Sequence, residues 1–291
     1  MLAAAGYSLW YVSMNYAFVI HHGDNAHIYN FKVPLASPER HRAISFISFL
    51  PFSVLHWQPL YWTCVAAFYA AATLWFFRLW CRWTAPIAAF LYTFCLSLFW
   101  EHGGAVAEWW NPVATSLIIM AGWQCIYATE IRDALRAGEF WQRPLFPVWV
   151  HELNVFSLAW FYFQTGWGKL TTSGLAWVDG TSLQLHVHRF RLDFGEPQNF
   201  MHHLILSHRL TASLLSAGVL LLECSAILAV LPLFFPRFRW VRHLIGLGIT
   251  LFMLGIFLLF GLWAFESLFA LALLFLWPFD RWIPRWMQAG S

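Results

Sequence analysis

Apolar runs of about 20 residues recur along the chain, separated by short polar breaks that carry most of the arginines. A helix of that length crosses the hydrocarbon core of a bilayer, which is about 30 Å thick. The pattern therefore predicts an all-α, polytopic integral membrane protein, a bundle of about eight transmembrane helices. The predicted spans are 4–20, 59–77, 85–100, 112–129, 148–168, 210–234, 243–261 and 263–278.

Two of the polar breaks are long. The first, 21–58, contains Pro38 just after Ser37, a combination that favours the start of a helix, and we expect a short amphipathic helix over 38–52. The second, 169–209, is rich in histidine, glycine and polar residues, and we expect it to form a long loop.

Composition supports a membrane location. Hydrophobic residues make up 60% of the chain and charged residues 11%, whereas soluble domains average about 25% charged residues. Many of the 20 tryptophans stand near the ends of predicted helices, where the membrane–water interface favours them. The net charge is only +3 and the chain has no run of basic residues, so we expect a lipid bilayer as its environment and no nucleic-acid partner.

The distribution of basic residues predicts the orientation. We number the loops between the predicted spans from the N-terminus, so that the two long connections are loops 1 and 5. Of the 17 Lys and Arg residues, ten lie in the even-numbered loops or at the C-terminus, and the other seven lie in the two long connections. Positive residues favour the cytoplasmic side. We therefore expect both termini in the cytoplasm and the 169–209 segment outside.

The most informative polar residues follow the fifth predicted span. Gly166, Gly168 and Lys169 stand at its end, and Lys169 is one of only two lysines. In a structural interpretation, the lysine reaches water at the membrane edge and the glycines allow close helix packing. In a functional interpretation, a lysine withdrawn from water acts as a base.

The same glycines are candidates for a ligand site. Gly166 and Gly168 remove side chains at the point where a flat ring would need room, and Trp167 and Trp177 flank that position and could stack on it. We therefore name these four residues as candidate cofactor-binding residues. Tight helix packing through the glycines remains the alternative.

A resemblance to a known family enters at this segment. Thr165 to Leu170 (TGWGKL), followed by Trp177 and Gly180, resembles a segment in the membrane domain of the vitamin K-dependent γ-carboxylase family, also called the horizontally transferred transmembrane (HTTM) domain. Residues 214–235 (LLSAGVLLLECSAILAVLPLFF) resemble the family helix that carries one acid, here Glu223. Residues 101–122 resemble its entry into the helix before the lysine helix.

The resemblance implies a fold, an activity and a cofactor. It implies a single HTTM-like transmembrane domain over 1–291, without the C-terminal lumenal domain that grips the substrate of the carboxylases. It assigns Lys169 as the catalytic base and gives Glu223 a supporting catalytic role. The implied cofactor is a reduced, vitamin K-like quinone, and the implied activity is that of a carboxylase-like enzyme of the carbon–carbon lyase type.

Differences from the family keep an alternative open. Asn111 and Pro112 occupy the region where the carboxylases carry a histidine, and the penultimate helix lacks a second one. The alternative is a non-catalytic membrane protein that binds a lipid, a quinone or a protein partner. A transporter is a third possibility, but no inverted repeat is visible.

The remaining polar residues carry weaker signals. His186 and His188 form an HxH pair and His202 and His203 are adjacent, but neither pair has an acid or cysteine at strict metal-ligand spacing, and we predict no metal site. Glu152 is expected to lie about 25 Å along the helix from Lys169, too far for contact. The five cysteines are expected to be free thiols.

Overall fold

The computed structural model describes residues 57–101, 111–129, 147–194 and 199–260, together with isolated positions at 2, 5–7, 9, 10, 13, 133, 272, 275 and 276. Within these residues nearly every position is helical and no strand occurs. The all-α prediction is therefore confirmed for the described part of the chain.

Long helices lie where the hydrophobic pattern predicts them. They are α4 (Gln58–Phe76), α5 (Cys81–Glu101), α6 (Asn111–Ile126), α8 (Val148–Ser173), α11 (Arg209–Ser225) with its extension η4 (Ala226–Val230) and α12 (Leu231–Phe234), and α13 (Arg239–Phe260). The predicted spans 4–20 and 263–278 and the predicted helix 38–52 lie wholly or largely outside the described residues.

Two segments in the described part of the chain are long and apolar enough to cross a membrane, Arg209–Phe234 and Pro236–Leu259. Only 28% and 22% of their most apolar windows are buried in the protein. A core helix of a soluble protein would be mostly buried, so the apolar exposed faces of these two segments favour contact with lipid.

The described residues of the predicted long loop, 169–194 and 199–209, are almost all helical, and the sequence analysis placed no helices there. Helix α8 continues beyond Lys169 to Ser173, and η3 (Gly174–Asp179), α9 (Thr181–Phe194) and α10 (Phe200–Ser207) follow. The polar composition of α9 conceals a helical apolar spacing: Leu183 and Val187, four residues apart, face a small core with Ile205.

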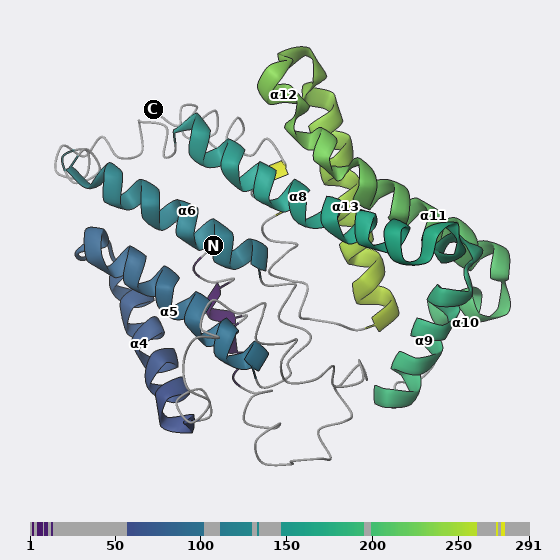
Figure 1. The fold of residues 1–291 in the computed structure, drawn as a ribbon, viewed down its shortest axis with the longest axis horizontal. Helices are drawn as coiled ribbons and strands as arrows, with labels where there is room; N and C mark the ends of the chain where they lie inside the picture. Colours follow the sequence, from purple (N-terminus) through teal and green to yellow (C-terminus); the bar gives the residue numbers. More distant parts are fainter. Residues whose placement is uncertain are drawn as a thin grey trace, which may run out of the picture. The chain divides into compact units, whose positions relative to one another are not determined.

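The chain divides into two compact units, and the first comprises residues 1–150. In this unit α4 packs on α5 and α5 packs on α6 (Figure 1). Buried aromatic residues hold the first pair together, with the rings of Phe68 and Tyr92 5.7 Å apart. The buried hydroxyl of Tyr61 lies 3.1 Å from that of Ser13, which satisfies both polar groups.

The second unit, residues 151–291, contains the candidate site. Helix α11 contacts η3, α9, α10 and α13 (Figure 1), so it is the common support of this unit. A buried cluster of Val187, Ile205, Ala212 and Leu259 joins α9, α10, α11 and α13. Side chains presented by α11 are therefore held from several directions.

Candidate functional site

Lys169 and Glu223, the two predicted catalytic residues, form an ion pair. The Lys169 Nζ atom donates to both carboxylate oxygens of Glu223, at 2.6 Å to Oε1 and 2.7 Å to Oε2. The Glu223 side chain is 2% exposed and that of Lys169 is 21% exposed. The acid is therefore enclosed, while the ammonium group lies at the edge of the protein.

Gly166 sets the approach of α8 to α11 at this pair. A Cβ atom on Gly166 would lie 2.7 Å from Glu223 Cβ and 2.9 Å from the backbone nitrogen of Cys224, distances that real Cβ atoms do not show. The expectation that Gly166 leaves room for a ring is therefore wrong, because α11 fills that space. The packing alternative explains this glycine. A Cβ atom on Gly168 would meet nothing within 4 Å, so open space remains on that side of α8.

A second glycine attaches the chain after Lys169 to the same helix. Gly180 has φ +82°, and a Cβ atom there would lie 2.6 Å from the backbone nitrogen of Ser213, in the first turns of α11. The Ser213 hydroxyl donates to the carbonyl oxygen of Val178, and Arg209 Nε donates to that of Asp179 at 3.2 Å. The Trp-x-x-Gly sequence thus builds a turn that docks on the start of α11.

Trp177 lies beside the ion pair. Its ring centroid is 5.1 Å from Lys169 Nζ, a cation–π contact, and 5.8 Å from the ring of His186. Trp167, the other predicted aromatic residue, is 56% exposed and stacks on Phe163 at 6.1 Å. Lys169, Trp177 and His186 therefore adjoin one another, whereas Trp167 lies about 160° away from Lys169 around α8.

Tyr162 is a polar residue that the sequence analysis did not single out. It is 2% exposed, and its hydroxyl has no hydrogen-bond partner among the described residues. It precedes Gly166 by four residues and Lys169 by seven, so the three lie on one face of α8. This helical spacing from Lys169 is the feature of the sequence that could have pointed to Tyr162 as a residue near the site.

Two of the described histidines, His202 and His203, have structural contacts. Buried His202 accepts from the backbone of Asn199 in a capping box at the start of α10, and its Nε2 atom contacts the carbonyl oxygen of Leu259. His203 Nδ1 lies 2.9 Å from the hydroxyl of Ser207. Among the described residues, no three His, Cys, Asp or Glu side chains form a group that could hold a metal ion.

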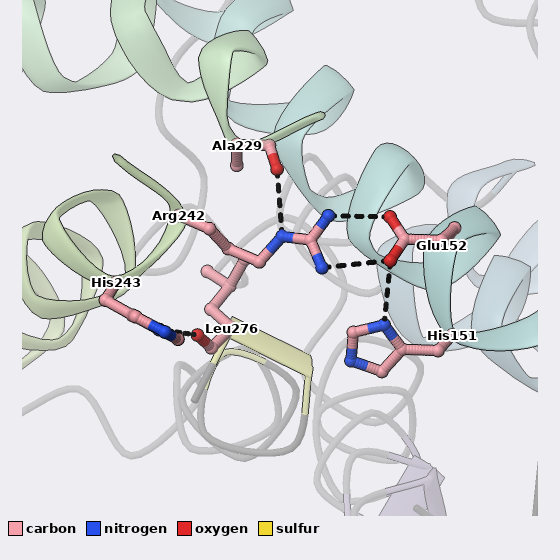
Figure 2. Close-up of polar contacts among 6 residues, drawn as sticks. All are labelled: His151, Glu152, Ala229, Arg242, His243 and Leu276. Carbon is pink, nitrogen blue, oxygen red and sulfur yellow. Dashed lines mark hydrogen bonds and ion pairs between the residues drawn. The ribbon is translucent and has the colours of Figure 1, made fainter. Parts of the chain in front are cut away.

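A second polar cluster joins the start of α8 to α13. The Arg242 guanidinium donates to both carboxylate oxygens of Glu152, at 3.0 Å and 2.6 Å (Figure 2). Its Nε atom donates to the carbonyl oxygen of Ala229 at 3.0 Å. His151 Nδ1 lies 3.5 Å from Glu152. Each of the three guanidinium nitrogens of Arg242 thus donates a hydrogen bond that helps to hold α8, η4 and α13 together. Glu152 therefore pairs with Arg242 and not with Lys169, which lies 17 residues further along α8.

The electrostatics of the Lys169 pair determine what it can do. An ammonium group has three N–H donors, of which two point at Glu223, so one remains for a further acceptor. Removing either partner from a buried pair leaves an uncompensated charge, which is costly in a medium of low polarity. The arrangement can therefore hold one proton between two groups and present a donor to a bound molecule.

Comparison of the chain with protein-family models, with curated proteins and with solved structures finds no match.

Proposed function

We propose that the chain is a polytopic integral membrane protein with about eight transmembrane helices, and that Lys169 and Glu223 form a proton-transfer site for a quinol-type ligand. The resemblance of the TGWGKL segment to the carboxylase membrane domain motivates the ligand class and the role of Lys169. The observation that carries the proposal is the two-point contact between Lys169 and the enclosed carboxylate of Glu223.

The residues present fit such a ligand. Lys169 keeps one N–H donor that can point toward a ligand oxygen, and the nearby Trp177 ring offers an apolar face. A Cβ atom at Gly168 would meet nothing within 4 Å, whereas α11 fills the space at Gly166. In the carboxylases, as the resemblance implies, a reduced quinone supplies on oxidation the strong base that removes a proton from a carbon acid.

The chain's own residues handle a proton in this proposal. A proton moves from Lys169 Nζ to a Glu223 oxygen over 2.6 Å, which converts the ion pair into a neutral amine and a carboxylic acid. A weakly polar surrounding favours the neutral forms, because it penalises separated charges. The Lys169 amine then accepts a proton from a hydroxyl group of the ligand and becomes an ammonium again.

Replacement of Lys169 by arginine tests this role. An arginine keeps the positive charge beside Glu223 but does not release its proton at ordinary pH. We expect purified wild-type protein to accelerate the oxidation of a reduced naphthoquinone by dissolved oxygen over the uncatalysed background. We expect Lys169→Arg to bind the naphthoquinone without accelerating its oxidation. Equal turnover by the two proteins would exclude Lys169 as the base.

A non-catalytic binding protein is the second candidate function. The close packing of Gly166 against α11 favours it, because that contact gives the glycine a purely structural role. In this case the wild type and Lys169→Arg would retain a lipid, a quinone or a protein partner equally, and neither would oxidise the reduced naphthoquinone.

A further inference from the structure

The least explained polar group in the second unit is the hydroxyl of Tyr162. A phenol transferred from water into the protein loses its hydrogen bonds to water, so buried tyrosines normally have a protein partner for the hydroxyl. The Tyr162 side chain is 2% exposed, and its hydroxyl is fully enclosed without a partner among the described residues. This arrangement lowers stability unless another molecule supplies the missing bond.

The position of Tyr162 relates the hydroxyl to the ion pair. Tyr162, Gly166 and Lys169 share one face of α8, and Gly166 is the residue in contact with Glu223. The Tyr162 ring packs edge-on against Phe252 of α13, with centroids 6.3 Å apart. The ring is therefore fixed between helices, with its hydroxyl in the neighbourhood of the charged pair.

We propose that Tyr162 is a third ligand-binding residue of the site and donates its hydroxyl hydrogen to an oxygen of the bound ligand. The inference rests on the proposed function, and it specifies the ligand further. The ligand must carry an oxygen acceptor, such as a quinone carbonyl or a quinol oxygen, that reaches into the bundle as far as Tyr162. Lys169 and Tyr162 would then present two donors from positions seven residues apart on α8, and the ligand would have to pass beside the contact of Gly166 with α11 that lies between them.

The test uses Tyr162→Phe, which removes one oxygen atom and leaves the packing of the ring against Phe252 intact. Binding of 2-methyl-1,4-naphthoquinone to the purified, detergent-solubilised protein is measured by equilibrium dialysis. We expect the variant to bind about five- to tenfold more weakly than the wild type, the loss of one hydrogen bond. Without naphthoquinone we expect its thermal midpoint to equal or exceed that of the wild type, since an unpartnered buried group has been removed.

Tyr61→Phe is the matched control, because Tyr61 is equally buried but its hydroxyl contacts Ser13 at 3.1 Å. We expect this control to bind the naphthoquinone as the wild type does and to have a lower thermal midpoint. If Tyr162→Phe instead lowers the midpoint of the ligand-free protein as Tyr61→Phe does, the Tyr162 hydroxyl has a protein partner and the inference is overturned.

A further variant separates failure of this inference from failure of the proposed function. Lys169→Met combined with Glu223→Gln removes both charges together and leaves Tyr162 in place. If this double variant loses binding while Tyr162→Phe binds within twofold of the wild type, Tyr162 is not a ligand donor and the proposed function stands. If the wild type does not bind, or the double variant binds equally well, the proposed function fails and the role of Tyr162 fails with it.

Discussion

At the residue scale, the Lys169–Glu223 pair has a structural consequence that is independent of any ligand. Lys169→Met leaves the 2%-exposed Glu223 carboxylate without a counter-charge, and Glu223→Gln leaves the ammonium without one. We expect each single change to lower the free energy of unfolding by about 3 kcal/mol. The double change should cost less than the sum of the two, because it removes both charges. Unfolding in detergent by a chemical denaturant measures the three values, and simple additivity would contradict a direct ion pair.

The two glycines before Lys169 should respond oppositely to alanine. Alanine is the better helix former by about 1 kcal/mol, so Gly168→Ala, in open space, should raise the thermal midpoint. Gly166→Ala should lower it, because the new Cβ atom overlaps Glu223 and Cys224 of α11. Differential scanning fluorimetry of the two variants gives the comparison. A stabilised Gly166→Ala protein would show that α8 and α11 are not in contact at this point.

At this scale the sequence predicted which residues form the site better than it predicted what lies around them. Lys169 and Glu223 were chosen because their segments resemble the carboxylase membrane domain and because charges inside apolar segments are rare, and the structure places them together. What lies opposite a glycine was not predictable, because the helical spacing of α8 cannot say which helix covers which face. For the same reason the open side at Gly168, the filled side at Gly166 and the enclosed hydroxyl of Tyr162 required the structure.

At the scale of elements, η3 depends on its attachment to α11 through Gly180. Gly180→Ala meets two obstacles, a left-handed backbone conformation and the backbone nitrogen of Ser213 at 2.6 Å. Gly174→Ala is the control, because Gly174 also has a positive φ, +57°, but open space around it. We expect Gly180→Ala to cost at least about 1 kcal/mol more than Gly174→Ala in unfolding free energy.

That difference isolates the docking of η3 from backbone strain, which both variants share. Equal costs would mean that the turn is held by its own conformation and not by α11. The segment around η3 also marks the limit of the sequence analysis for elements. Long apolar runs located α4 to α6, α8, α11 and α13, whereas α9 and α10 were missed because they are 14 and 8 residues long, shorter than a membrane-crossing run, and their core is small.

The cluster at the start of α8 allows a test that concerns geometry and not charge. Arg242→Lys keeps the positive charge but cannot bond both oxygens of Glu152 and the carbonyl oxygen of Ala229 together. We expect a loss of about 1–2 kcal/mol in unfolding free energy. If Arg242→Lys left the unfolding free energy unchanged, charge alone would hold α13 to α8.

At the scale of the whole molecule, the orientation in the membrane is the main prediction. In a cysteine-free background, a cysteine at exposed Leu185 of α9 should react with a membrane-impermeant maleimide in intact cells. A cysteine at exposed Arg237, between the two segments that can cross a membrane, should react only after permeabilisation. The reverse labelling would invert the proposed topology, and labelling of both in intact cells would exclude a crossing of the membrane by the segment Arg209–Phe234.

The two ion pairs of α8 also bear on how the protein assembles. The helix carries an acid near its first turn and a base near its last, and each meets its opposite on α11 or α13. If α8 entered the bundle upside down, Glu152 would approach Glu223 and Lys169 would approach Arg242. Both encounters would repel, and in lipid no water would relieve them. We therefore expect the two pairs to favour the observed direction of α8 over the inverted one as the helices assemble.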